Sequence, residues 1–479
     1  MVRALELAPQ IDTLWAQFAD LIRFFNFRHP LDPRLHAVLA RALEHPAVDP
    51  GELVRPISST ALSRGAEQVF NDPLLLRLLE ETVIRDPQLE HLLVLERRKA
   101  LREGSVPVDT LVAIAHQCFN TEYVFAESED ERAELAKLAR SAHLRDLAVY
   151  AAYRPLNSLP EANDVAKRLE STPLASLARR QIVEPADEQA LRAGLASFGG
   201  PASAVSAAVR AQYEENPYPR WRRVPLITPE ERTPSRVLIA GCGTGQHAIS
   251  TALRMPQAKL LAIDLSVASL AYAKRKTTEL GVANIEYRQA DLLSLRPEGG
   301  RFDHVEASGV LHHLEDPLAG WRVLTDLVEP GGSMRIGLYS ERGRRAIVRA
   351  RELIAEQGFP PTPEGIRRCR AAILARAQDD LFARLVRNED FYSMSGCRDL
   401  LFHVQEHRLD LPRVKQMIGE LGLVFAGFEF ADSGMSVTRY AARYPHDAAM
   451  TDLDNWDRLE GEYPDTFSRM YQFRVLKPR

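Results

Sequence analysis

Apolar residues in the second half of the chain occur in short runs that end at glycine or at an acidic residue. The run Val237 to Ala240 predicts a buried strand, and the segment His247 to Leu253 predicts a helix. Gly241, Gly243 and Gly245 stand between them. Glycine lets the backbone turn sharply and lets a ligand contact the main chain, and the first turn of a helix has free N–H groups. The pattern therefore predicts a ligand-binding turn between a strand and a helix.

Six further apolar runs predict strands in the same part of the chain. They lie within residues 258–266, 284–292, 301–314, 327–338, 423–430 and 470–477. The first two of these runs end near the acidic residues Asp264 and Asp291. Strands that alternate with helices indicate a doubly wound parallel sheet, whose ligand binds at the carboxyl ends of the strands. We therefore expect an α/β fold with a seven-stranded, Rossmann-like sheet and a helical insertion before the sixth strand.

The first 200 residues predict helices. Leucines 74, 75, 78 and 79 share one helical face, and Asp72-Pro73 and Asp86-Pro87 have the form of N-caps with proline at the first helical position. Helices are also expected within 346–357, 363–377, 396–407 and 412–421. We expect four parts: a helical N-terminal interaction domain (1–200), an α/β core (201–340), a helical insertion or lid (341–422) and the last strands of the sheet (423–479).

Composition narrows the class of protein. The chain has 479 residues, of which 26% are charged and 45% hydrophobic, as is ordinary for globular proteins. The net charge of −4 gives no general attraction to nucleic acid or to anionic membranes. No apolar run is long enough to predict a membrane-spanning helix, and the N-terminus lacks the apolar core of a signal peptide. The scattered cysteines favour neither a metal site nor a disulfide framework, which makes a reducing cytoplasm the expected location.

Asp264 has two interpretations. A carboxylate at this distance after the glycine-rich turn can accept hydrogen bonds from both hydroxyls of a ribose. It can also cap the helix that is expected after Ser266. The glycine-rich turn before it favours the ribose.

The run Gly241-Cys242-Gly243-Thr244-Gly245, with Asp264, Asp291 and the turn after Ser308, resembles motifs of class I S-adenosylmethionine (SAM) methyltransferases of types 11 and 12. The segment 391–408 resembles the regulatory segment of certain bacterial methyltransferases. These are the protein lysine methyltransferases and the methyltransferases fused to tetratricopeptide repeats. The resemblance covers residues 205–479 and, more thinly, the helical N-terminus. It implies SAM as the cofactor.

The resemblance also implies where the cofactor binds. The glycine turn would shape the cofactor loop, Asp264 would bind the ribose, and Asp291 with Leu292 would bind the adenine. For Asp291 the alternative is a solvated turn. Ser308 would lie near the methionine end. The full predicted set is Ala240, Gly241, Gly243, Gly245, Gln246, Asp264, Leu265, Asp291, Leu292, Ser308 and Tyr218.

One position departs from the family. Many relatives carry an acidic residue where this chain has Ile239, and that acid helps to hold the methionine end of SAM. Either backbone groups around Ala240 and Gly241 take over this task, or another segment does. The aromatic residues before the first strand can shield the sulfonium or fix the linker to the edge of the sheet. They are Tyr213, Tyr218 and Trp221.

Methyl transfer is an in-line displacement that mainly needs orientation and shielding. A general base matters where the acceptor must lose a proton. Two histidines follow the fourth strand and can act as that base or cap the next helix. The helix expected at 396–407 places further polar residues near one face, where they can line the acceptor pocket, bind a metal or face solvent; we expect no metal. The candidates are His312, His313, Tyr392 and His403, with Asp399, Glu406 and His407 beside them.

We expect a cytoplasmic SAM-dependent methyltransferase whose helical domain selects the acceptor. Transfer to a protein side chain is the leading interpretation, and O- or N-methylation of a small molecule is the alternative. A SAM-binding scaffold without catalysis is the third interpretation. The apolar residue Ile239 favours it, whereas the acidic residues Asp264 and Asp291 argue against it. The arginine-rich stretch 342–370 is either a docking surface for an acidic partner or a set of solvated helix faces. The expected partner is the methyl acceptor, without membrane or nucleic acid; the oligomeric state does not follow from the sequence.

Overall fold

The computed structural model describes residues 1–479 apart from 232, 298–299, 431–433 and 468–469. The chain divides into two compact units. The first, here the helical unit, contains Met1–Glu188, Arg220–Ile227 and Ile354–Leu400. The second, here the sheet unit, contains Gln189–Pro219, Thr228–Leu353 and Leu401–Arg479. The insertion that the sequence places at 341–422 is therefore divided: its middle groups with the N-terminal helices, and its two ends group with the sheet.

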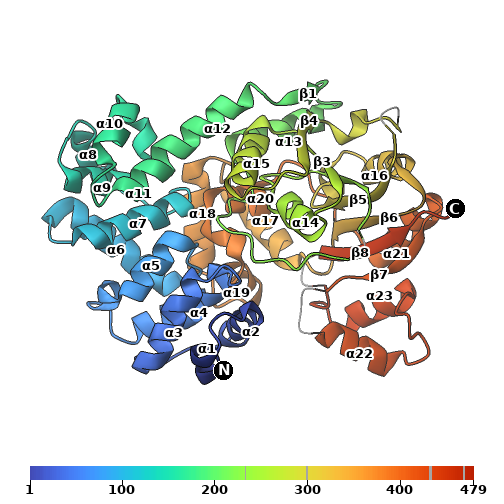
Figure 1. Ribbon diagram of the computed structural model, residues 1–479, viewed down its shortest axis with the longest axis horizontal. Coiled ribbons are helices and arrows are strands. Elements are labelled where there is room, and N and C mark those ends of the chain that lie inside the picture. The colour runs from blue at the N-terminus through green and yellow to red at the C-terminus, as the bar shows by residue number, and fades with distance from the viewer. Residues whose placement is uncertain (232, 298–299, 431–433, 468–469) are drawn as a thin grey trace. The chain divides into compact units, whose positions relative to one another are not determined.

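Proline and aspartate set helix starts in the helical unit. The carboxylate of Asp72 accepts a hydrogen bond from the N–H of Leu74 and begins α5 (Pro73–Glu81), and Asp86 begins α6 (Pro87–Glu103) in the same way, as the sequence predicts. The other α-helices here are α1 (Val2–Leu7), α2 (Asp12–Ile22), α3 (Pro33–Glu44), α4 (Val54–Leu62), α7 (Val108–Asn120), α8 (Glu129–Leu138), α9 (Leu144–Ala151), α10 (Ala162–Leu169), α11 (Ala175–Ala178), α18 (Pro363–Leu374) and α19 (Asp380–Val386), while α12 (Glu184–Arg192) and α20 (Met394–Phe402) cross the unit boundary (Figure 1).

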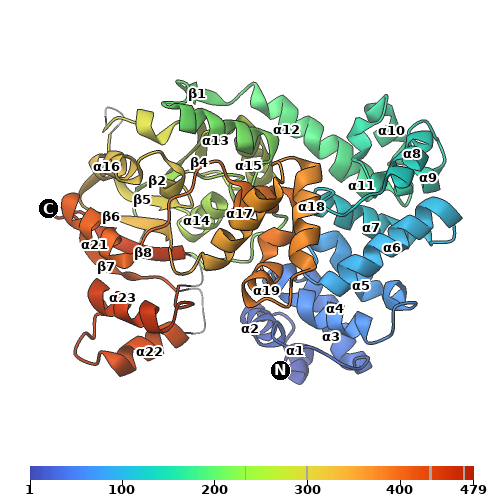
Figure 2. The same ribbon diagram turned by 180° about the vertical axis from the view of Figure 1, so that it is seen from behind.

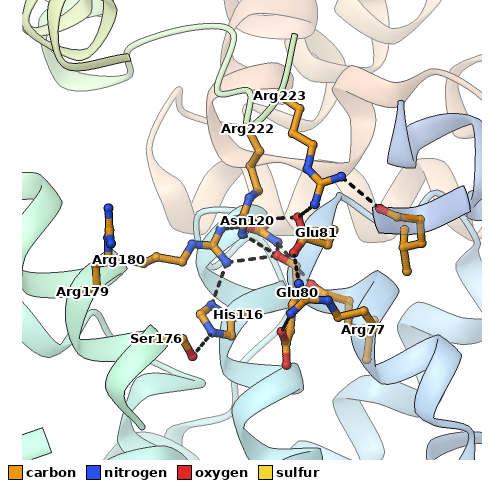
Figure 3. Close-up of polar contacts among 12 residues, drawn as sticks. Arg77, Glu80, Glu81, His116, Asn120, Ser176, Arg179, Arg180, Arg222 and Arg223 are labelled. Carbon is orange, nitrogen blue, oxygen red and sulfur yellow. Dashed lines mark hydrogen bonds and ion pairs between the residues drawn. The ribbon is translucent and has the colours of Figure 1, made fainter. Parts of the chain in front are cut away.

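A polar network in the helical unit holds the C-terminal end of α5 (Figure 3). The main-chain oxygen of Glu80 accepts hydrogen bonds from Arg180 at 3.0 Å and from Arg222 at 2.6 Å. The buried carboxylate of Glu81 pairs with Arg223 at 2.9 Å. The last carbonyls of a helix lack intrahelical partners and favour cations. The segment 220–227 is thereby fixed to the helices of its own unit.

The sheet unit contains an eight-stranded sheet in the order β1-β4-β3-β2-β5-β6-β8-β7. The strands are β1 (Ala196–Phe198), β2 (Arg236–Ala240), β3 (Lys259–Asp264), β4 (Ile285–Ala290), β5 (Phe302–Ser308), β6 (Val328–Tyr339), β7 (Val424–Phe428) and β8 (Met470–Leu476). Neighbours from β1 to β6 pair in parallel, and β8 pairs antiparallel with β6 and β7. The seven expected strands are present. The expected count is wrong by one, because the three-residue β1 is too short to show a period in the sequence.

Helices cover both faces of the sheet (Figure 2). Successive residues of β2 point to opposite faces: Val237 and Ile239 pack with α14 (Gln246–Arg254) and α15 (Val267–Glu279), whereas Leu238 packs in the core of the other face. Burial on both faces explains the unbroken apolar run of this strand. The other face is covered by α16 (Pro317–Leu327), α21 (Leu411–Glu420) and α23 (Leu453–Glu462). The remaining α-helices are α13 (Ala204–Glu215), α22 (Met435–Arg443) and α17 (Arg345–Gln357), which crosses the unit boundary at Ile354.

The helix expected at 396–407 is wrong at both ends. It is α20, which spans Met394–Phe402, so His403 and Glu406 lie in the loop that follows. The N–H of Gln405 bonds to Nδ1 of His403 at 3.1 Å instead of to a carbonyl one turn back. This local side-chain bond competes with the helical pattern.

Across the described ranges of the chain, no helix combines the length and apolar character that crossing a bilayer requires.

Candidate cofactor and acceptor site

The glycine turn lies at the carboxyl end of β2, near the centre of the sheet. Gly241 and Gly243 have φ values of +66° and +53°, a region that favours glycine. A Cβ on Gly241 would stand 2.7 Å from Cβ of Val310, and one on Gly243 would stand 2.8 Å from the main-chain oxygen of Tyr218. Side chains are excluded at both positions. The turn therefore presents bare main chain, which suits close contact with a ligand.

Asp264 ends β3 and contacts this turn. Its Oδ2 accepts a hydrogen bond from the N–H of Gly243 at 2.8 Å, and its Oδ1 accepts one from the N–H of Ser266 at 2.9 Å. Burial raises the pKa of Asp264 in spite of these bonds. The cap of α15 is Ser266, whose side chain accepts from the N–H of Ser269, so the interpretation of Asp264 as the helix cap is wrong. Each carboxylate oxygen keeps a second lone pair, so Asp264 fits a ribose.

Asp291 is buried, with 2% of its surface exposed, so the solvated-turn interpretation is wrong. Its Oδ1 accepts from the N–H of Leu293 at 2.9 Å and caps the 3₁₀ turn Leu292–Ser294. Its Oδ2 accepts from the N–H of Ala202 at 2.8 Å. Leu292 is buried in the apolar core of the sheet. These hydrogen bonds fix the side chain of Asp291 at the end of β4, and its contact with adenine stays a prediction.

The segment from Tyr213 to Pro219 contacts both cofactor loops. The carboxylate of Glu214 accepts hydrogen bonds from the first two N–H groups of α15, at 2.5 and 3.2 Å. The main-chain oxygen of Tyr213 accepts from Oγ of Ser266 at 3.0 Å. Thr244, in the glycine turn, donates its hydroxyl to the main-chain oxygen of Pro219. The segment therefore covers the loops after β2 and β3, and Tyr218 lies within it. Trp221 is buried and belongs to the helical unit.

Three histidines from two distant loops of the sheet unit stack together. His312 and His313 belong to the 3₁₀ turn Leu311–His313 that follows β5. His313 stacks on His403 with ring centroids 3.6 Å apart, and His312 stacks on Tyr339 at 3.7 Å. The hydroxyl of Tyr213 lies 3.2 Å from Nε2 of His403. Val310, which packs against the glycine turn, directly precedes this cluster, so it adjoins the cofactor turn.

Burial keeps two of these imidazoles neutral. Burial, followed by the charges of His313 and Arg344, holds the pKa of His312 well below its usual range. A hydrogen bond to the backbone of Gly337 opposes this lowering of the pKa. Burial also lowers the pKa of His313 to about 4. Nδ1 of His313 donates to the main-chain oxygen of Gln405 at 2.7 Å, which leaves Nε2 with a lone pair. A neutral imidazole of this kind can accept a proton from a methyl acceptor.

The remaining candidates from the sequence are Tyr392, Asp399, Glu406 and His407. Tyr392 is fully buried in the helical unit, where its hydroxyl donates to the main-chain oxygen of Val386 at 2.7 Å, and its place in an acceptor pocket stays a prediction. Asp399 is buried and belongs to the same unit. Glu406 is buried and pairs with Arg344 at 2.6 Å. The main-chain N–H of His407 donates to the oxygen of His312 at 2.8 Å.

Sequence reasoning missed Tyr339 and Arg344. The guanidinium of Arg344 lies 3.7 Å from the ring centroid of Tyr339, which also stacks on His312. The signal that could have found Tyr339 is its position, because Tyr339 ends β6 just as Ser308 ends β5, and both strand ends point to the ligand edge of the sheet.

Residues 237–332 match a family model described as a methyltransferase domain. An uncharacterized protein of Synechococcus sp. is 30% identical over 274 residues, which cover 50% of this chain and 64% of that protein. The ubiquinone biosynthesis O-methyltransferase of Azotobacter vinelandii is 38% identical over 100 residues, 21% of this chain and 42% of that enzyme. The chain thus spans less than two thirds of the length of both relatives. The solved structure of PKMT2 from Rickettsia typhi has a TM-score of 0.39 and 14% identity over 58% of this chain and 53% of that one.

The parallel sheet, the glycine turn at its centre and the carboxylate at the end of the adjacent strand define a Rossmann-like nucleotide-binding domain. The matching family model makes the class specific. Residues 237–332 thus form a methyltransferase domain, and its cofactor is S-adenosylmethionine.

Proposed function

We propose that this chain methylates a protein side chain, and that the helical unit selects the protein. The observation that supports this proposal concerns the segment Ile354–Leu400, which is inserted between β6 and β7. This segment groups with the N-terminal helices into one unit with its own buried core. A small acceptor needs only a short lid for closure. A helical unit of this extent, formed from three separate parts of the chain, supports recognition of a macromolecule.

The cofactor site follows the strand ends. Backbone groups of Ala240 and the glycine turn, with Gln246 at the start of α14, would bind the methionine and adenosine parts, and Ser308 would lie beside the methionine. Asp264 would bind the ribose. The adenine would lie against Leu265, Asp291 and Leu292, and Tyr218 would cover the site. When bound, SAM supplies an electrophilic methyl group on a positively charged sulfur.

The histidine cluster would act on the acceptor. The acceptor atom forms a bond to the methyl carbon as the carbon–sulfur bond breaks, and S-adenosylhomocysteine remains. The proton that the acceptor loses would pass to a neutral imidazole of the cluster, and the lone pair on Nε2 of His313 supports this residue as the one that accepts it. His403 and Tyr213 would orient the acceptor through their mutual contact.

Small-molecule O-methylation is the second candidate. The relatives named ubiquinone biosynthesis O-methyltransferase favour it, although they match about 100 residues of this chain. The buried, neutral imidazoles also suit a hydroxyl acceptor, because such a group gives up its proton as it is methylated.

Transfer of a labelled methyl group distinguishes the candidates. Purified protein and SAM with a tritiated methyl group are incubated with a fractionated lysate. Label in protein bands supports the leading proposal, and label in the small-molecule fraction supports the second. Label in neither fraction, together with measurable binding of S-adenosylhomocysteine, supports a scaffold without catalysis. Asp264→Ala serves as the control, in which labelling at a subsaturating concentration of SAM should fall in every fraction.

A further inference from the structure

Glu306 is an acidic residue in the middle of the sheet. It lies on β5, is 1% exposed, and is the register partner of Ile239 on β2, so it faces the side of the sheet that α14 covers. A carboxylate at this depth is costly unless it is paired. The partner comes from α14, because Nε2 of His247 contacts Oε2 of Glu306.

Further groups complete the surroundings of Glu306. Its Oε1 lies 3.3 Å from Nε2 of His304 and 3.2 Å from Nη2 of Arg254, and its Oε2 accepts a hydrogen bond from the hydroxyl of Thr251 at 3.1 Å. Burial alone would raise the pKa of Glu306, but the hydrogen bonds from His247 and His304 hold it well below its usual range. The carboxylate is therefore ionised and saturated by its partners.

His247 and Arg254 hold opposite ends of α14. His247 is the second residue of the helix and directly follows Gln246, whereas Arg254 is its last residue. The N-cap of α14, Gly245, has a φ of +85° and provides no side-chain cap. The polar tie between the first turn of α14 and the sheet is therefore made by His247, which Arg335 of β6 also approaches, with Nη1 3.0 Å from Nε2.

We propose that His247 is a positioning residue for SAM. Its pair with Glu306 fixes the first turn of α14, and with it Gly245 and Gln246, at the cofactor turn. Glu306 thus supplies, from β5, a buried acid in register with Ile239. The inference rests on the proposed binding of SAM at the glycine turn. Neither His247 nor Glu306 needs to contact the cofactor for this role.

The test compares three variants by calorimetry with S-adenosylhomocysteine and by urea unfolding. His247→Ala should lower affinity about tenfold, as expected for the loss of one hydrogen bond to a charged group. His247→Gln, whose side-chain amide can still donate to Glu306, should bind within about threefold of the wild-type chain. Arg254→Ala removes a different charged partner of Glu306, at the far end of the same helix. It should lower stability and leave affinity within about twofold, because the pair of His247 with Glu306, which holds the first turn of α14, remains in this variant.

Wild-type affinity in folded His247→Ala, or an equal loss of affinity in Arg254→Ala, would overturn the proposal. If His247→Ala does not fold, Glu306→Gln decides: it weakens the same pair at constant volume and should lower affinity several-fold, and unchanged affinity rejects the inference. Asp264→Ala tests whether the cofactor binds at the glycine turn, independently of the role of His247. If it too binds S-adenosylhomocysteine normally, the placement of the cofactor at the glycine turn is at fault.

Discussion

The imidazoles of His313 and His403 stack with centroids 3.6 Å apart and an interplanar angle of 17°. His313 follows β5, and His403 follows α20, which ends at Phe402 instead of continuing as the sequence predicts. The early end of the helix lets His403 reach the strand-end loop. The stack therefore joins the acceptor side of the proposed site to the loop beside the cofactor turn.

Replacing His403 with alanine should reduce turnover and spare the cofactor. The variant loses the ring that stacks on His313 and the contact with the Tyr213 hydroxyl, so we expect a fall in the single-turnover rate of about a hundredfold, typical for a group that orients or transfers a proton. Affinity for S-adenosylhomocysteine should change by less than about twofold. His407→Ala, in the same loop, is the matched control with near-normal turnover. Full activity in His403→Ala would assign that ring a packing role.

The free energy of unfolding should fall as the pH is lowered, because His313 is buried as a neutral ring. Its pKa is about 4 in the folded chain, because burial favours the neutral ring, and an unfolded histidine has a pKa of about 6.5. The unfolded chain therefore binds more protons between these values, and stability that is present above the unfolded pKa is lost as the pH falls toward 4. Between pH 7 and pH 5 the loss should be about 2 kcal/mol.

Urea unfolding of the wild-type chain and of His313→Asn at both pH values isolates this contribution. The variant should lose about 2 kcal/mol less than the wild-type chain over the same interval. Equal losses in the two proteins would mean that His313 is not held neutral by the fold.

Asp264→Ala should lower affinity for S-adenosylhomocysteine between tenfold and a hundredfold, since hydrogen bonds to a charged group contribute about 1.5–3 kcal/mol. The control is Asp303→Ala. Asp303 also accepts two main-chain N–H bonds, from Ser235 and Arg236 at 2.9 Å each, but at the amino end of β2 and β5. It should lower stability without lowering affinity. A similar loss of affinity in both variants would remove the ribose assignment.

Gly241→Ala should abolish cofactor binding. The new Cβ would meet Val310 at 2.7 Å, so the turn must shift. Gly281→Ala is the matched control, because Gly281 has the same φ of +66° and a Cβ added there would meet no atom within 4 Å. The control should cost about 1–2 kcal/mol of stability from backbone strain alone and keep its affinity. Calorimetry and urea unfolding of both variants separate strain from packing, and retained binding in Gly241→Ala would contradict the close approach at this turn.

Much of the sheet was predictable, because its apolar runs and strand-end residues are local signals. The run Val237 to Ala240 and the end of β3 at Asp264 needed no knowledge of distant contacts. The end of α20 was not predictable, since the ring of His403 competes for a main-chain N–H in a way that helical periodicity does not show. The strand β1 was missed because three residues carry no period.

By itself, the sequence determined the parallel strands and the glycine turn, because burial on both faces and positive φ impose residue types that can be recognised locally. The class of ligand followed from the resemblance of this turn and of Asp264 to a known family. Only the tertiary structure decided that Glu306 pairs with His247, that His313 stacks on His403, and that Ile354–Leu400 groups with the N-terminal helices. Each of these depends on the competition among many possible partners for a buried charge, a ring face or an apolar surface. That competition is resolved only when the chain is packed.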